Sequence, residues 1–198
     1  MKIGRIYVCC AAIPEGECDF TVYPRAREDE IRSVRNDRLK KEKYYAWRLL
    51  EAACISHGIS FTEFDIKKTD NGAWVCDGFY FSLSHTDDAV AVAISDTPVG
   101  VDIEIVSDRA ARIAKKVFSE DELGGAMTLS ERERNLYTTR LWTMKESIFK
   151  SLSARAFSPQ NIVIADHPVK TVDVEINGKD YVASVAGDGA EKAKFDIR

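Results

Sequence analysis

The sequence of 198 residues lacks the features that mark a membrane, secreted or zinc-binding chain. Its longest stretch without Asp, Glu, Lys or Arg, residues 52–62, has 11 residues, whereas a spanning helix needs about 20 apolar ones. The first residues, MKIGRIYVCC, hold no long apolar core before a small-residue cleavage site, so we expect no secretory signal. The five cysteines are odd in number and form no Cys-x-x-Cys pair. This argues against a disulfide framework or zinc knuckle and favours a reduced, cytoplasmic protein.

The chain also lacks an excess of positive charge and any Pro/Gly/Ser-rich linker. Lys and Arg number 28 against 32 Asp and Glu, for a net charge of −4, so the surface as a whole repels nucleic acid, although a local basic patch could bind phosphates. Hydrophobic residues make up 45% of the sequence, which is typical of a globular protein with a substantial core. The length fits one large domain or two small ones.

The hydrophobic pattern predicts a strand–helix–strands order that occurs twice. The first set has a strand over residues 2–10, a helix over 28–57, and strands over 79–83 and 89–95. The second has a strand over 99–105, a helix over 109–118, a longer helix from Ser130 to Leu152, and strands over 162–165, 169–176 and 181–186. Ser119 with Glu122 and Ser130 with Glu133 have capping-box spacing, and Asn177-Gly178 predicts a tight hairpin. We therefore expect an α+β fold of two similar halves, residues 1–98 and 99–198.

Two carboxylates stand out on the predicted strand 99–105. Asp102 and Glu104 are two residues apart, so their side chains share one face while Val101, Ile103 and Ile105 face the core. Adjacent like charges are unfavourable unless a cation or water relieves them. A solvated strand face is one interpretation; a site for a hard divalent cation such as Mg²⁺, which prefers carboxylate oxygens, is the other.

The long helix after Ser130 carries a second candidate group. Glu146 and Lys150 are four residues apart and neighbours on one face, pointing away from the apolar stripe that includes Met144 and Ile148. A surface ion pair would explain them, but Trp142, one turn earlier, is out of place on a fully solvated face.

Other candidates are weaker by themselves. Ser84 and His85 end the strand FSLSHT; a structural histidine and a Ser-His-Asp triad both stay open, although no G-x-S-x-G motif supports the triad. Residues 25–43 hold eight basic and five acidic side chains, compatible with solvated helix surface or with phosphate binding. Arg109, Arg112, Lys115 and Lys116 form an acid-free patch that could dock an acidic protein.

Four segments occur along the chain in the order FSLSHT, VGVDIE, FSEDEL and LWTMKESIFK. Taken together, this ordered set resembles the motifs of the 4′-phosphopantetheinyl transferase superfamily. The length is similar to that of its monomeric subfamily (the surfactin-synthetase-activating type), in which two pseudo-symmetric halves share one active site at their junction. The resemblance implies transfer of 4′-phosphopantetheine from coenzyme A to a serine of an acyl or peptidyl carrier protein. Alternatives are a Mg²⁺-dependent nuclease or phosphatase, and a coenzyme A-binding module without turnover.

The resemblance also assigns residues. Asp102, Glu104 and Glu146 match the family ligands of Mg²⁺, with Glu146 as general base; Lys150 matches the lysine that contacts the transferring phosphate and could protonate the leaving oxygen. Ser84 and His85 match nucleotide-phosphate contacts. The looser matches are Lys145 near the pantetheine arm and Arg32, Arg35 and Arg48 at the 3′-phosphate. Arg109, Arg112, Lys115 and Lys116 would meet the carrier protein. One departure is Gly72-Ala73-Trp74, where the family has Gly-Lys-Pro.

Overall fold

A computed structural model describes residues 3–70, 72–126, 128–152 and 158–198. The larger elements of the N-terminal part are β1 (Tyr7–Ala12), α1 (Arg25–Ser33), α2 (Asp37–Ser56), β2 (Ile66–Lys68), β3 (Trp74–Cys76), β4 (Tyr80–Thr86) and β5 (Ala89–Ser95). Those that follow are β6 (Val99–Ile105), α3 (Arg109–Val117), α4 (Glu120–Gly124), α5 (Glu131–Leu152), β7 (Val169–Ile176), β8 (Lys179–Gly187) and β9 (Lys194–Ile197). In the part of the chain that the structure describes, no helix is long and apolar enough to cross a bilayer.

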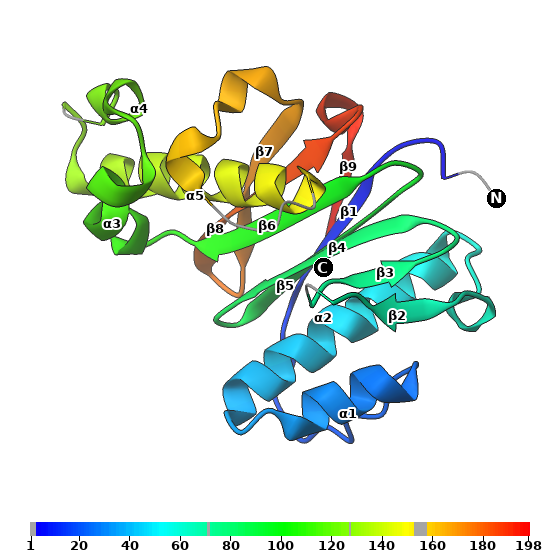
Figure 1. The fold of residues 1–198 in the computed structure, drawn as a ribbon. Coiled ribbons are helices and arrows are strands. Elements are labelled where there is room, and N and C mark those ends of the chain that lie inside the picture. The colour runs from blue at the N-terminus through cyan, green and yellow to red at the C-terminus, as the bar shows by residue number, and fades with distance from the viewer. Residues whose placement is uncertain (1–2, 71, 127, 153–157) are drawn as a thin grey trace.

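The expected repetition of strand, helix and hairpin is confirmed. In the first unit, β1 precedes α2 and then pairs with β5, the second strand of the β4–β5 hairpin. In the second unit, β6 precedes α5 and pairs with β8, the second strand of the β7–β8 hairpin. All four pairings are antiparallel. The fold is therefore α+β, with a small sheet and a long helix in each unit (Figure 1).

The last strand crosses to the first unit. β9 pairs in parallel with β1 and extends the first sheet to the order β4-β5-β1-β9, while the second sheet has the order β6-β8-β7. The C-terminal residues thus complete the sheet of the N-terminal half. The division of the chain after residue 98 stays a prediction.

The two sheets face each other and bury one core between them. Alternate residues of β1 and β6, including Val8, Cys10, Val101 and Ile103, belong to this core. The helices cover the opposite faces, so α2 lies on the first sheet and α5 on the second (Figure 1). Burial of these apolar side chains is the main force that joins the halves.

Two predicted elements are wrong in detail. The helix expected over 28–57 is divided, because Val34 is extended and Asn36 caps α2 by accepting a hydrogen bond from the Leu39 amide at 3.0 Å. The strand expected over 162–165 is instead two short 3₁₀ turns, Pro159–Asn161 and Ile164–Asp166. The buried ammonium of Lys145 binds the carbonyl oxygens of Pro159 and Ile162, and the Ile162 carbonyl is an acceptor that a strand ladder would use.

The local turn signals are confirmed. Both hydrogen bonds of the Ser119–Glu122 capping box form, and Ser130 and Glu133 make the same reciprocal pair at the start of α5. Asn177 and Gly178 both have positive φ, as a tight hairpin turn requires. These caps and turns fix where α5 begins and how β7 returns along β8.

Candidate active site at the junction of the two sheets

The alternation expected for β6 places its carboxylates away from the core between the sheets. Val101 and Ile103 lie in that core, and Asp102 and Glu104 project from the other face. Asp102 is only 4% exposed, so the interpretation as a solvated strand face is wrong for this residue. A carboxylate this deeply buried needs hydrogen-bond donors or a cation.

Hydroxyl groups of the first unit supply some of these donors. The Ser84 Oγ donates to Asp102 Oδ1 at 2.8 Å, and the Thr86 Oγ1 donates to Glu104 Oε2 at 3.0 Å. Alternation along β4 places these two side chains on the same face. The carboxylates of the second unit therefore meet the edge strand of the first.

Helix α5 adds Lys150 from the other side. Its Nζ donates to Asp102 Oδ1 at 2.8 Å and to the Val101 carbonyl at 3.1 Å. This contact depends on Gly100, because a Cβ atom there would lie 1.9 Å from the Ser147 carbonyl oxygen. The absence of a side chain lets the backbone of α5 lie directly on β6, with Glu146 one turn before Lys150.

The electrostatics show that these carboxylates are short of positive charge. Burial, and then the charge of Asp102, raise the pKa of Glu146 to about 7. The same two causes raise the pKa of Glu104. The second oxygen of Asp102, Oδ2, is buried and has no hydrogen-bond partner among the described residues. Because hard divalent cations bind carboxylate oxygens and reduce such repulsion, the chemistry of this donor set fits Mg²⁺.

As the structure stands, no three His, Cys, Asp or Glu side chains within the described ranges are close enough to hold a metal ion. Cationic side chains partly neutralise the cluster instead. Lys150 binds Asp102 at 2.8 Å, and the Arg109 Nη1 lies 3.7 Å from Glu104 Oε1. Three unscreened carboxylates repel one another, so a bound cation would have to draw Glu146 and Glu104 toward Asp102.

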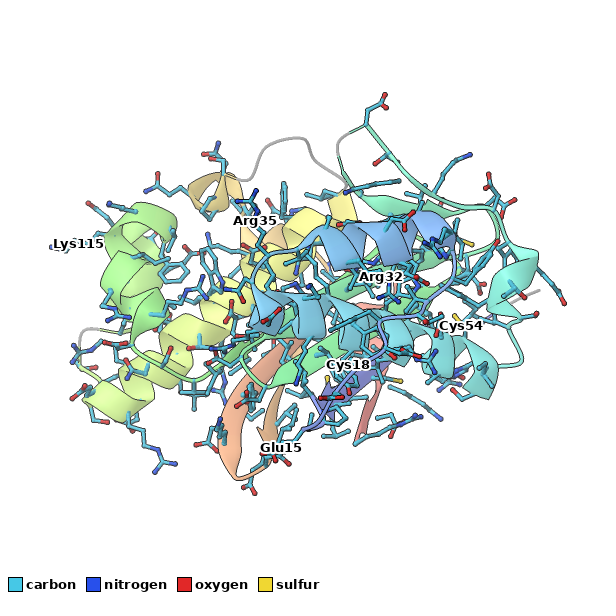
Figure 2. The ribbon with its side chains drawn as sticks, turned by 90° about the horizontal axis from the view of Figure 1, so that it is seen from below. Glu15, Cys18, Arg32, Arg35, Cys54 and Lys115 are labelled. Carbon is cyan, nitrogen blue, oxygen red and sulfur yellow. The ribbon has the colours of Figure 1, made fainter. Side chains whose placement is uncertain are left out.

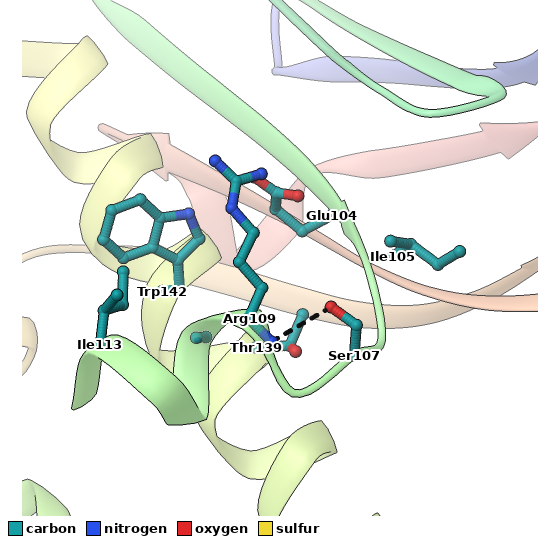
Figure 3. Close-up of a pocket in the computed structure, with 8 residues that line it drawn as sticks. Glu104, Ile105, Ser107, Arg109, Ile113, Thr139 and Trp142 are labelled. Atoms are coloured by element: carbon teal, nitrogen blue, oxygen red, sulfur yellow. Dashed lines mark hydrogen bonds and ion pairs between the residues drawn. The ribbon is translucent and has the colours of Figure 1, made fainter.

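Trp142 lies beside Glu104 rather than on open surface. Its indole favours the charged form of Glu104 and so opposes the effect of burial on the pKa of that carboxyl, and Figure 3 shows both side chains with Arg109 around a small pocket. The pocket has a volume of about 10 Å³, enough for about one water molecule. The place of Trp142 on the face of α5 that carries Glu146 is thus explained by its contact with the carboxylate cluster.

A larger cavity of about 500 Å³ opens beside Lys150. Its lining comes from residues 72–76 and 79–83, Pro98, Val99, Phe149 and Lys150. The altered tripeptide Gly72-Ala73-Trp74 forms part of this wall. The Trp74 indole is fixed there by a 2.7 Å hydrogen bond to Glu30. The cavity therefore joins an aromatic wall to an ammonium group.

His85 lies on the opposite face of β4 from Ser84, toward α2. Its Nδ1 is 2.9 Å from the Glu42 carboxylate. Burial lowers the pKa of His85, the charge of Glu42 opposes this shift, and Lys150 and Lys43 add to it. From the sequence, Lys43 counts among the basic residues of the segment 25–43, and Glu42 does not stand out, because it is one of many charged residues on a basic helix.

The three expected arginines do not join the junction cluster. Arg32 binds Glu28 and the Asp19 carbonyl, and Arg48 binds Glu51 on its own helix. Arg35 is exposed in the turn between α1 and α2, and Figure 2 shows Arg32 and Arg35 beside α1. Their part in phosphate binding stays a prediction that this arrangement does not support.

Lys145 is also placed apart from the cluster. Its side chain is fully buried, and its Nζ contacts Glu122 Oε1 at 2.9 Å and the carbonyls of Pro159 and Ile162. All three protons of the ammonium therefore have acceptors, and the residue ties α4 and the 3₁₀ turns to α5. A contact of Lys145 with a pantetheine arm is not supported by this geometry.

The basic patch on α3 is exposed. Arg112, Lys115 and Lys116 lie at the surface, and in Figure 2 Lys115 projects from the outer end of the molecule. Arg109 belongs both to this patch and to the site, since it approaches Glu104. The patch thus begins at the carboxylate cluster and runs outward along α3.

The chain is similar to several known proteins of one family. Residues 98–193 match the model of the 4′-phosphopantetheinyl transferase superfamily. Over 127 residues the chain is 32% identical to the 4′-phosphopantetheinyl transferase gsp of Aneurinibacillus migulanus, an alignment of 64% of this chain and 48% of that protein. It is 35% identical over 71 residues to the transferase Sfp of Bacillus subtilis strain 168, covering 36% of this chain and 32% of Sfp. The transferase AcpT of Salmonella typhi is 38% identical over 82 residues, 39% of this chain and 42% of AcpT.

The segment of residues 98–193 is therefore similar to the 4′-phosphopantetheinyl transferase superfamily, which confirms the resemblance that the motifs predicted. The matched family segment begins at the start of β6 and includes Asp102, Glu104, Glu146 and Lys150. The alignments span less than half the length of these curated relatives.

Proposed function

We propose that this protein transfers 4′-phosphopantetheine from coenzyme A to a serine hydroxyl of an apo acyl or peptidyl carrier protein and releases 3′,5′-ADP. The observation that carries the proposal is the convergence of Ser84, Asp102 and Lys150 at one point between the two units. It lies beside a cavity large enough for part of a nucleotide. The match of residues 98–193 to the superfamily supports the reaction class.

Coenzyme A would lie along the cavity and the β4 edge. The aromatic wall suits a flat base, and Lys150 at the same cavity suits a phosphate group. Asp102, Glu104 and Glu146 would hold Mg²⁺, which supplies neutralisation of the pyrophosphate charge when bound. The unpaired Asp102 Oδ2 supports this assignment.

The chain's own residues then position the groups that react. Glu146 accepts the proton of the carrier serine, whose oxygen forms a bond to the β-phosphorus of coenzyme A. The P–O bond to the 3′,5′-ADP group breaks, and Lys150 donates a proton to the departing oxygen. Phosphoryl transfer of this kind depends mainly on alignment and charge stabilisation.

The carrier protein would dock on the α3 patch of Arg109, Arg112, Lys115 and Lys116. Its position favours this role, because the patch starts beside Glu104 and its outer residues are exposed. Reversing the charges of Arg112 and Lys116 should raise the KM for an acidic carrier while leaving affinity for coenzyme A unchanged. Reversal of Lys192, exposed on a different element, is the control. Equal KM values for both variants would remove α3 from the interface.

Both units contribute to one site within a single chain, so we propose that a monomer is active. The five cysteines are all free, which supports a cytoplasmic location.

The direct test is the mass of apo carrier proteins after incubation with this protein, coenzyme A and Mg²⁺. An increase of one phosphopantetheine group supports transfer, and chelation of the metal should abolish it. Coenzyme A binding without a mass change would favour the module without turnover, an alternative made plausible by Ala73 at the family lysine position. Cleavage of DNA by the wild type but not by Asp102→Asn would favour the nuclease.

A further inference from the structure

Glu42 on α2 is a buried carboxylate that faces the site through His85. Its side chain is 11% exposed, and both of its oxygens have partners. Oε2 lies 2.9 Å from His85 Nδ1, and Oε1 accepts a 3.0 Å hydrogen bond from Arg38 Nε. Two directional contacts hold the carboxylate in one orientation.

The position of Arg38 is fixed in turn by the β4–β5 turn. The Arg38 Nη2 atom binds the Asp87 carboxylate. The neighbouring Asp88 binds Lys179 of β8. A chain of ion pairs therefore runs from the second unit through the turn and Arg38 to Glu42. This chain limits the freedom of Glu42 and hence of the imidazole bonded to it.

The contact determines which nitrogen of His85 a ligand can reach. An ionised carboxylate only accepts hydrogen bonds, so Nδ1 must carry a proton, and Nε2 on the far side of the ring is left for another partner. The cations near the ring come from two elements, Lys43 of α2 and Lys150 of α5. Their positive charge makes this position favourable for an anionic group.

We propose that Glu42 is a positioning residue that holds His85 by Nδ1 and so presents Nε2 to a phosphate group of the bound nucleotide. The inference rests on the proposed function, since that function supplies the phosphate. Glu42 itself touches no substrate in this arrangement and acts through the imidazole.

The first test needs no ligand. In ¹⁵N NMR spectra of the wild-type protein, the His85 ring should show a protonated Nδ1. Glu42→Ala should remove this preference, whereas Glu42→Gln should largely keep it, because the amide oxygen can accept the same bond. Glu51→Gln is the control, since Glu51 lies on the same helix and pairs with Arg48. A His85 protonated only at Nε2 in the wild type, or unchanged by Glu42→Ala, would overturn the proposal.

The second test measures binding of 3′,5′-ADP and coenzyme A by calorimetry. Loss of one hydrogen bond to a charged group corresponds to about 10-fold weaker binding, and Glu42→Ala should show this loss. In a His85→Ala background the same substitution should have no further effect. An equal loss in both backgrounds would mean that Glu42 acts independently of His85. Wild-type protein that binds neither ligand would contradict the proposed function and the phosphate contact, while the NMR result still decides the positioning of the ring.

Discussion

The two units share one topology but differ at the interface between helix and sheet. In the first unit, large side chains of α2 fill this interface: Trp47, Leu50 and Cys54 are fully buried and pack with β5 residues such as Val92 and Ile94. In the second, the equivalent layer between α5 and β8 contains Thr143 and Ser184, whose hydroxyl oxygens are 2.8 Å apart. Gly100 leaves no side chain at all against α5.

This difference agrees with the proposed placement of the catalytic side chains on α5 rather than on α2. An interface filled by indole and leucine side chains contributes stability through burial, and Glu42 of α2 contacts His85 on the edge strand β4 rather than a residue of β5 or β1. The small and polar interface of the second unit brings Glu146 and Lys150 onto β6. The first unit contributes its edge strand, through Ser84 and Thr86. Under the proposed function, the second unit would supply the acid–base and metal-binding side chains, and the first unit would supply the edge strand and the cavity wall.

Glu146→Gln should produce the largest effect. The substitution keeps the size of the side chain but removes the carboxylate, so transfer to an apo carrier should fall by at least about 100-fold, as expected for loss of a general base. The measurement is the initial rate of carrier modification by mass spectrometry.

The matched control is Glu131→Gln, in the first turn of the same helix and exposed. Both variants should have the circular dichroism spectrum of the wild type. If Glu146→Gln works at a near-normal rate, α5 does not carry the base and the contrast between the units loses its main support.

Gly100→Ala tests the close approach of α5 more directly. The added methyl group would lie 1.9 Å from the Ser147 oxygen and 2.5 Å from the Ser151 nitrogen, so the helix must move. Overpacking of this kind costs about 1–3 kcal/mol in the free energy of unfolding, measured by urea titration, and transfer should slow as well. Gly124→Ala is the comparison, because a Cβ there meets nothing within 4 Å. Equal stabilities of the two variants would show that the helix is not held by this contact.

Local sequence patterns predicted the main strands, helices and turns of both units. Alternation along residues 99–105 placed Asp102 and Glu104 on one face, and the capping box at Ser130 located the start of α5. The Asn177-Gly178 turn located the β7–β8 hairpin. These features depend on neighbours in sequence, so propensity and periodicity are enough to identify them.

Contacts distant in sequence could not be predicted in this way. Lys145 precedes Glu146 in a recognisable motif, yet its ammonium is buried against residues that follow the helix. Arg32 and Arg48 pair with Glu28 and Glu51 on their own helices; this helical spacing is local, but the choice of a carboxylate over a phosphate as partner depends on the fold. The pairing of Glu42 with His85 joins α2 to β4, and only the three-dimensional structure reveals such a pair.

The free energy of unfolding should depend on pH because of Glu30 in the first unit. Burial alone would raise the pKa of Glu30, but Arg27, the Trp74 indole and Lys43 outweigh it and lower the pKa to about 2. A carboxylate with a lowered pKa stabilises the fold fully above its ordinary value and loses this contribution as the pH falls toward 2. The full difference between the two pKa values would correspond to about 3 kcal/mol, and solvent screening of this partly exposed carboxylate reduces the contribution below that value.

The test compares urea unfolding of wild type and Glu30→Gln from pH 7 down to pH 2.5. The wild type should be the more stable at pH 7, and the difference should shrink below about pH 4.5, the ordinary range of a glutamate. Glu17→Gln, at an exposed carboxylate outside the ion pairs of the described residues, should show no such convergence. A difference that is constant with pH would mean that the charge of Glu30 does not stabilise this unit.

Ser84→Ala should give the smallest effect. It distinguishes a contribution of the first unit to stability from a contribution to the proposed transfer reaction. The variant loses the hydrogen bonds to Asp102 Oδ1 and from the Ile103 amide, so unfolding should cost about 1 kcal/mol less. Of the two side-chain donors to Asp102 Oδ1, Ser84 and Lys150, only Lys150 would then remain. We therefore expect transfer to slow by about 5-fold, which corresponds to the free energy of one hydrogen bond. Ser95→Ala is the control: Ser95 is similarly buried in the first sheet, and among the described residues its hydroxyl bonds only to Thr97 in its own turn. It should lose stability without losing transfer rate. If both variants lose stability alone, the first unit supports the site only as a core, and the contribution of its edge strand to the chemistry must be abandoned.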